Sequence, residues 1–395
     1  MSLIFILKRK STLMNGVHKD FLILGMLFAV TSFDTLLLGF AIPKIIVLYS
    51  LSKAQAGLLG TILMIGVGIG AIILGALSDV LGRKNIIIFS VSLFSTSTGL
   101  LGFAENFLSL AILLFFSGFG LGGGLTLSIA YLPEIIRDKP LEKYMCYFES
   151  FWGIGALFVV STSRILLERP LKELFFVGAF PFLLLPIFFK LSEIRAEKST
   201  ISGNIRELLS KYWKITILLW VIWFCGVYTY YGIFLWLPEV MSSIAGFKAG
   251  YSLLIPVYGI QIISPLFLSL IIRDDNTEKL LFLYSLAAAI FTLLSISASD
   301  FLVLGMISTS FFSIGGWVLF ILSTQKSYPQ KMRGIGVGSA ASVGRIGGIV
   351  APYFTGLLLD IYGIFVAFTA ISLMFVVIAI LSFPLLKIRK EVRAH

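Results

Sequence analysis

The chain has 395 residues, of which 58% are hydrophobic and 13% charged, and its mean hydropathy is +1.00. Soluble domains carry about 25% charged residues, and a chain this apolar lacks the polar material to cover a water-facing surface, which excludes an ordinary soluble enzyme. The net charge of +11 does not indicate a nucleic-acid partner, because Lys and Arg are spread over short polar intervals and form no basic cluster.

About twelve apolar runs are long enough to cross a membrane as helices, since lipid requires each span to satisfy its own backbone hydrogen bonds. The fold class we predict is an all-α integral membrane protein with these transmembrane helices in two six-helix bundles. The runs cover residues 21–46, 55–77, 85–104, 108–132, 145–167 and 173–190, and then 213–237, 249–272, 280–299, 301–323, 335–358 and 363–386.

Most Lys and Arg residues lie before the first run, in every second interval and in the tail. The positive-inside rule therefore places both termini in the cytoplasm, and we expect a multi-pass protein of the plasma (cell) membrane. At the start, MSLIFILKRK has its charges after a very short apolar run, the wrong order for a cleavable signal peptide. The expected domains are a cytoplasmic arm (1–20), an N-terminal bundle (21–190), a cytoplasmic linker (191–212), a C-terminal bundle (213–387) and a cytoplasmic tail (388–395).

Cysteine and histidine are too few for the chemistry they usually support. Cys146 and Cys225 lie far apart in apolar runs, and His18 and His395 lie in the arm and at the last position. We therefore expect no catalytic residues, no metal site and no cofactor, and any proton carrier has to be a carboxylate. The stretch GFGLGG (118–123) fits a dinucleotide-binding pattern, but it lies inside a span with no strand before it, so its glycines indicate helix packing.

The two halves show a weak internal repeat. Pro133 and Arg137 of LPEIIRD correspond to Pro329 and Arg333 of YPQKMRG, at the same end of the fourth span of each half. The same shift brings Glu149 onto the position of Arg345. Six plus six helices related as parallel repeats is a known transporter arrangement.

Four segments resemble the major facilitator superfamily. The loop GALSDVLGRK (Gly75–Lys84) matches its G-x-L-x-D-x-x-G-R-K pattern between the second and third helices. Residues 328–352 (YPQKMRGIGVGSAASVGRIGGIVAP) and 230–238 (YYGIFLWLP) are similar to the sugar-porter and synaptic-vesicle-2-like branches. Residues 32–43 (SFDTLLLGFAIP) are similar to aromatic-acid and organic-solute proton symporters. The resemblance covers the whole chain and implies two bundles around a central cavity that opens alternately to each side.

The chain also departs from the family pattern. Leu114 stands where the fourth helix usually carries Arg, and Ala130 and Lys326 replace acids that usually precede each loop proline. A common partner of substrate or proton is therefore missing, and so are the acids that usually lock the cytoplasmic side. The fifth helix has no Gly-Pro pair, which counts against a drug antiporter.

The loop motif contains the expected gating residues. Gly75 and Gly82 allow close helix approach and a tight turn, and we expect Asp79 to pair with Arg83 or with a basic residue of the neighbouring half. Such a charged latch would hold one face closed, the alternative being ordinary loop charge. The further gating candidates, with the same alternative, are Arg137 and Arg333.

Charges inside the spans are the sharper signal, since each costs at least about 2.5 kcal/mol at the bilayer centre and is retained mainly where it faces a cavity or a partner. Asp34 is expected roughly midway across the bilayer and is our proton-coupling residue, with Glu149 as its competitor. Arg345 is expected to bind an anionic solute or to pair with a carboxylate. A structural polar contact is the alternative for each of these residues.

Aromatic side chains suggest what enters the cavity. One face of residues 213–237 presents aromatic rings at helical spacing, with two hydroxyls near its middle. Aromatic rings with hydrogen-bonding hydroxyls suit sugars or planar organic acids. The alternative is that this row of rings belongs to the hydrophobic core and contacts no solute. Trp236, near the outer end, is expected in the interfacial belt. The expected substrate-binding residues are Arg345, Tyr228, Tyr231, Tyr258, Gln261 and Trp317.

We predict a secondary active transporter that moves a small polar organic solute, a sugar or an organic acid, by alternating access as a proton symporter. The open alternatives are an uncoupled uniporter or exchanger, a multidrug proton antiporter and a non-transporting receptor. A membrane enzyme would need a cofactor motif or a nucleophile and base, which the sequence does not show. The expected partners are the solute, protons and membrane lipids, with no nucleic acid, and the expected state is a monomer.

Overall fold

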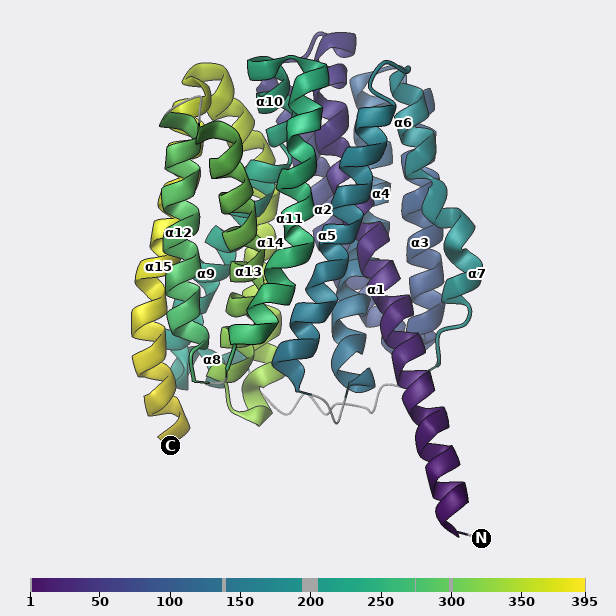
Figure 1. The fold of residues 1–395 in the computed structure, drawn as a ribbon, viewed down its shortest axis with the longest axis vertical. Helices are drawn as coiled ribbons and strands as arrows, with labels where there is room; N and C mark the ends of the chain where they lie inside the picture. Colours follow the sequence, from purple (N-terminus) through teal and green to yellow (C-terminus); the bar gives the residue numbers. More distant parts are fainter. Residues whose placement is uncertain (1, 137–139, 194–204, 274, 298–300, 395) are drawn as a thin grey trace.

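The computed structural model is an upright bundle of helices (Figure 1), with no strand among the residues it describes. These are residues 2–136, 140–193, 205–273, 275–297 and 301–394, with side chains described between positions 18 and 385. Both chain termini lie at the same end of the bundle. We name this the terminal end, and we name the other end, where α6 (Leu171–Gly178) and α10 (Leu237–Ala245) lie, the distal end.

Twelve candidate membrane spans lie in the described part of the chain, which confirms the expected number. In the first half the helices are α1 (Ser2–Tyr49), α2 (Lys53–Leu81), α3 (Arg83–Leu100) with η1 (Leu101–Phe103), α4 (Phe107–Ile135), α5 (Leu141–Ile165), and α6 followed by η2 (Phe180–Leu184) and α7 (Leu185–Phe188). The second half begins with the short α8 (Ile205–Lys211). Its first span consists of α9 (Trp213–Phe234) and α10 together. The other spans are α11 (Phe247–Ile271), α12 (Thr277–Ser297), α13 (Leu302–Ser327), α14 (Gln330–Ile361) and α15 (Gly363–Ala394).

Polar residues at helix starts explain why the spans extend beyond the apolar runs. Ser52 accepts a hydrogen bond from the Gln55 amide at 3.1 Å and caps α2, and Asn106 caps α4 in the same way. Gly82 adopts φ +87°, the left-handed region that favours glycine, so the expected tight turn between α2 and α3 is present.

Three spans differ from the expected outline. The arm is continuous with the first span, because α1 begins at Ser2 and projects beyond the bundle (Figure 1). The sixth span changes to a 3-10 turn that contains Pro181, and the seventh is divided between α9 and α10 just before Pro238. Both breaks have the same cause, since proline lacks the N–H that an α-helix uses.

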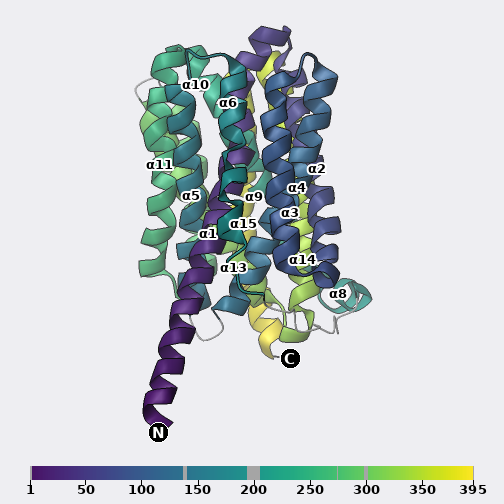
Figure 2. The same cartoon turned by 90° about the vertical axis from the view of Figure 1, so that its right-hand side faces the viewer.

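The helices of the first half (α1–α7, the first set) and of the second half (α9–α15, the second set) meet along two seams. In one seam α5 packs against α11, and in the other α2 packs against α14. Figure 2 shows α2 and α14 overlapping along one side of the bundle and α5 and α11 along the other. Within the sets, α2 packs on α4 and α1 on α5, and likewise α12 on α13 and α9 on α14. Arg345 and Glu149 lie at these seams, whereas Asp34 lies inside the first set.

Candidate functional site

Arg345 reaches from the second set to the first. It lies midway along α14, and its Nη2 donates a hydrogen bond to Oγ1 of Thr126 on α4 at 3.0 Å. It forms no ion pair with a carboxylate among the described side chains. Because a guanidinium has several N–H donors, this one bond leaves most of them available to a ligand.

The predicted aromatic face of α9 turns toward α14. A Cβ placed on Gly348, one helical turn from Arg345 on α14, would lie 3.3 Å from the Tyr231 ring. Tyr228 stacks on Phe224, with 6.2 Å between ring centroids. The structure therefore brings Tyr231 to the part of α14 that carries Arg345.

A chain of hydrogen bonds crosses the α5/α11 seam. Trp152 of α5 donates through Nε1 to the Tyr230 hydroxyl of α9, which donates to Gln261 Oε1 of α11 at 3.3 Å. Gln261 Nε2 in turn donates to Ser310 Oγ of α13 at 3.1 Å. The Trp317 ring centroid lies 5.8 Å from that of Tyr230. Two predicted residues, Gln261 and Trp317, thus meet around Tyr230, which the sequence did not single out.

Tyr258 has its hydroxyl already bonded inside the second set. The side chain is fully buried, and its O–H donates to the Phe234 carbonyl at 2.8 Å. Its ring centroid lies 5.3 Å from that of Phe40 on α1, so the ring contributes to the contact between the sets. A solute at this position would meet the ring rather than a free hydroxyl.

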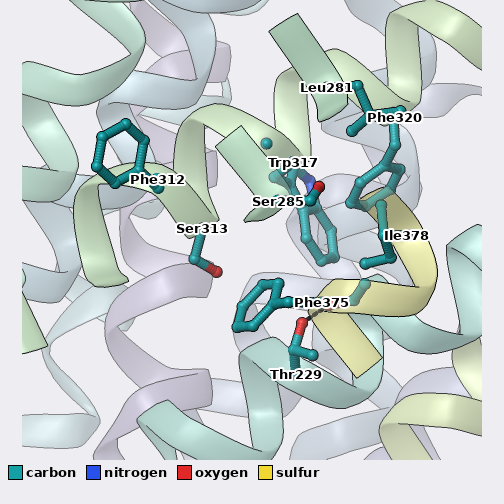
Figure 3. A pocket seen from close by; sticks show the side chains of 11 residues that line it. Thr229, Leu281, Ser285, Phe312, Ser313, Trp317, Phe320, Phe375 and Ile378 are labelled. Atoms are coloured by element: carbon teal, nitrogen blue, oxygen red, sulfur yellow. Dashed lines mark hydrogen bonds between the residues drawn. The ribbon is translucent and has the colours of Figure 1, made fainter. Parts of the chain in front are cut away.

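Trp317 also lines a small cavity inside the second set (Figure 3). The hydroxyls of Thr229, Ser285 and Ser313 share this cavity with several aromatic rings. Its volume is about 10 Å³, which accommodates about one water molecule. This cavity is therefore too small to be the solute site.

Asp34 faces the interior of the first set. It is 4% exposed, and its Oδ2 accepts hydrogen bonds from Thr98 of α3 and Ser117 of α4, both at 3.0 Å. Its Oδ1 is buried and has no hydrogen-bond partner among the described residues. The carboxyl is thus surrounded by hydroxyls rather than cations, with one oxygen free to hold a proton.

Glu149 lies on α5 in the seam between the sets. It is 1% exposed, and its Oε1 has no hydrogen-bond partner in the described part of the chain. One turn further along α5, Gly153 packs directly against the backbone of Gln261 on α11. The two predicted proton carriers therefore differ in place, because Asp34 is enclosed by one set and Glu149 lies where the sets meet.

The expected pair between Asp79 and Arg83 is not formed. Arg83 instead pairs with Glu134 at the end of α4, with 2.7 Å between Nη1 and Oε1, and its guanidinium lies over the Tyr131 ring. Asp79 is exposed and makes no ion pair with a described side chain. The reason is positional, since the end of α4 packs beside the start of α3, where Arg83 lies.

Another ion pair joins the sets at the terminal end. Lys326 Nζ of α13 lies 3.2 Å from Glu142 Oε1 of α5. Lys326, which replaces a usual acid, therefore makes a contact between sets that the sequence did not predict. Arg333 is exposed near the start of α14, and Arg137 lies outside the described residues. Gly75 faces α4, with Thr126 the nearest side chain.

Trp236 is not in an interfacial belt, contrary to expectation. It is fully buried, and its Nε1 donates to the Pro352 carbonyl of α14 at 2.9 Å. The chain turns between α9 and α10 at this residue, which directs the indole to the distal end of α14 instead of toward lipid.

Comparison with known proteins adds a family to this geometry. A family model described as the Major Facilitator Superfamily matches residues 24–352. A Bacillus subtilis protein that carries the name niacin/nicotinamide transporter NiaP is 31% identical, over 85% of this chain and 86% of that protein. A gentisate transporter of Corynebacterium glutamicum is 28% identical, over 85% and 80%. The xylose transporter XylE from E. coli, in a partially occluded inward open conformation, has the same fold, with a TM-score of 0.75 at 16% identity over 93% of this chain and 99% of that one.

Proposed function

Because this chain belongs to the Major Facilitator Superfamily, a family of multi-pass membrane transporters, we propose that it moves a small organic carboxylate together with protons by alternating access. The observation that carries the proposal is the placement of Arg345. This cation lies midway along α14, bonds across to Thr126 of the first set, and pairs with no described carboxylate. An uncompensated charge inside a membrane is retained where it meets a partner, and here the solute supplies it.

A carboxylate suits this position better than a neutral sugar does. Charge-assisted bonds from a guanidinium to a carboxylate can be bidentate and are stronger than bonds to neutral hydroxyls. The names of the relatives include carboxylic acids, gentisate for one and niacin, together with its neutral amide nicotinamide, for the other. Tyr231 beside Arg345, together with Tyr230, Gln261 and Trp317, supplies aromatic faces and polar tips for a planar ring.

Asp34 is the proton carrier in this proposal. It is buried in a span, accepts hydrogen bonds from Thr98 and Ser117, and keeps one oxygen without a described partner. A carboxyl in such a shell can be loaded with a proton from one side and release it to the other when the surrounding water changes. Glu149 is the second candidate.

The moving units in this proposal are the bundles of residues 21–190 and 213–387, joined by the linker 191–212. The excess of Lys and Arg on one side supports cytoplasmic termini, with the arm 1–20 and the tail 388–395 inside the cell. We further propose that the protein acts as a monomer in the plasma membrane. The terminal end is then the cytoplasmic end.

A thermal-shift screen of the purified protein tests the solute class. Benzoate, nicotinate and gentisate are compared with the neutral amides benzamide and nicotinamide and with xylose. A ligand at 100 times its dissociation constant adds about 2.7 kcal/mol of stability, so a carboxylate should raise the melting temperature and its amide should not. Uptake of the best ligand into proteoliposomes then separates a transporter from a receptor. Stabilisation by xylose alone would reject the carboxylate assignment.

A further inference from the structure

The α2/α14 seam is closed at the distal end by a carboxylate. Asp360 lies at the end of α14, and its Oδ1 and Oδ2 accept hydrogen bonds from the backbone amides of Lys53 and Ala54 at 3.1 and 2.7 Å. These amides belong to the first turn of α2, where N–H groups have no partner within the helix and where a negative charge is stabilised by the helix dipole. Asp360 thus caps a helix of the other set.

The two helices touch backbone to backbone around this bond. A Cβ on Gly356 would lie 2.6 Å from the Lys53 carbonyl oxygen, and one on Gly57 would collide with the Pro352 carbonyl. Lys53 Nζ lies 3.9 Å from Glu239 of α10, which adds an ion pair between the sets. The distal end of the seam is therefore tightly closed.

Toward the terminal end the same two helices diverge. On α14 the face that meets α2 runs through Gly356, Pro352, Ile349 and Arg345, and helical spacing continues it to Gly338 and Gly334. A Cβ on either of these last two glycines would meet nothing within 4 Å. The seam is consequently closed at one end and open at the other.

The opposite end of α2 carries a matching carboxylate. Gly57, Thr61 and Gly68 contact α14, and helical spacing from them brings Asp79 onto the same face of α2. Asp79 is exposed and has no ion pair among the described residues. Because the helices are antiparallel, Asp79 lies at the same end of the seam as the start of α14, just as Asp360 lies at the same end as the start of α2. One carboxylate is engaged in this conformation and the other is free.

We propose that Asp360 is a gating residue that holds the distal end of the α2/α14 seam closed while the terminal end of this seam is open, and that it releases α2 when the sets rock. The inference rests on the alternating-access mechanism proposed above. Its partners lie in the other set, more than 300 positions away in sequence, so the bonds exist only while the sets meet at the distal end. Opening that end transfers the Lys53 and Ala54 amides to water and leaves Asp360 without its donors.

Distances between spin labels test the proposal without any solute. One pair, Leu108→Cys with Phe247→Cys, reports the separation of the sets at the distal end. A second pair, Asn85→Cys with Lys331→Cys, reports it at the terminal end. All four positions lie away from Asp360, and the native cysteines are buried. Double electron–electron resonance is recorded in lipid nanodiscs for the labelled protein and for Asp360→Asn, Asp360→Ala and Asp360→Glu.

Loss of a helix-capping carboxylate typically changes an equilibrium by about fivefold. Asp360→Asn and Asp360→Ala should therefore raise the ratio of distal-open to distal-closed molecules by about that factor, with the terminal pair moving closer in the same molecules. Asp360→Glu should restore most of the original ratio, and Asp79→Asn should shift the ratio the other way. The matched control is Glu168→Gln, which removes an exposed carboxylate at the distal end that forms no ion pair with the described side chains of the second set and should leave both distances unchanged.

The outcomes separate this inference from the proposed function. If the sets exchange between two arrangements but Asp360→Asn and Asp360→Ala leave the ratio unchanged, Asp360 is not a gating residue and the mechanism stands. If every variant, including Asp79→Asn, keeps one fixed pair of distances and the liposomes show no uptake, alternating access itself is rejected. Melting temperature and gel-filtration profile identify any variant that fails to fold, and the Asp360→Glu protein then supplies the comparison.

Discussion

Asp34 is buried and Arg345 half-buried in spanning helices, and the molecule accommodates the two ionisable groups in opposite ways. Asp34 receives its hydrogen bonds from α3 and α4 of its own set. Arg345 sends its hydrogen bond to α4 of the other set. A charge enclosed by one set keeps its protein neighbours when the sets move, whereas a charge in the seam exchanges them. In the proposed function, this difference suits the first position to holding a proton and the second to a contact with the solute that changes when the sets move.

The largest expected effect is at the seam. Arg345→Gln removes the charge that meets the solute carboxylate, and uptake at low solute concentration should fall by about 100-fold, as expected for a lost charge-assisted pair. Arg345→Lys should also be impaired because it loses the bidentate geometry. The measurement is initial uptake of labelled solute into proteoliposomes, with the exposed Lys331→Gln of the same helix as control. Full transport in Arg345→Gln would remove Arg345 from the binding site.

The next effect concerns the enclosed charge. Asp34→Asn keeps the size and much of the hydrogen bonding of the side chain but cannot ionise. With a gradient of one pH unit, accumulation by one proton per solute should be about tenfold, and in Asp34→Asn it should fall to about equal concentrations on both sides. Exchange of solute between two sides at equal pH should continue, as counterflow measures.

Survival of accumulation in Asp34→Asn would contradict the proton assignment. Glu149→Gln is then the variant expected to abolish accumulation, because Glu149 is also a buried carboxyl within a span and has an oxygen without a described hydrogen-bond partner. That result would place proton exchange in the seam, so proton binding and solute binding would no longer be separated between Asp34 and Arg345.

A smaller effect sharpens the role of the contact between the sets. Thr126→Val removes the acceptor that orients Arg345, and the dissociation constant of the solute should rise by about fivefold, the usual range for one neutral hydrogen bond. The control is Thr61→Val, which also removes a bond across the seam, to the Ile349 carbonyl at 2.6 Å, without touching Arg345. Equal weakening by both variants would show that the seam, and not Arg345, sets affinity.

The smallest effect is expected for the ion pair at the terminal end. Lys326 and Glu142 are 10% and 27% exposed, so solvent partly screens their charges. A double-mutant cycle with Lys326→Ala and Glu142→Ala should give a coupling of about 1 kcal/mol or less in unfolding experiments. A coupling well above that value would mean that this pair, like Arg345, controls how the sets meet.

Sequence reasoning was most successful where the signal is local. The number of spans follows from apolar runs, and the turn at Gly82 follows from a loop motif, because both depend on neighbouring residues. The partners of Asp34 were not found, since Thr98 and Ser117 are ordinary hydroxyl residues in apolar runs. The partner of Arg83 had a usable signal in the sequence, because Glu134 directly follows the loop proline Pro133.

The sequence by itself determined that this protein is a helical membrane protein of the Major Facilitator Superfamily, because lipid requires long apolar helices and the loop motif is local in the chain. Only the tertiary structure decided that Arg345 bonds across a seam, that Lys326 meets Glu142, and that Asp360 caps α2. These contacts join residues far apart in sequence, and the packing of whole helices selects them. A buried polar group forms its hydrogen bond with whichever partner the packing of the helices brings within reach, and the spacing of residues along the chain does not predict that partner.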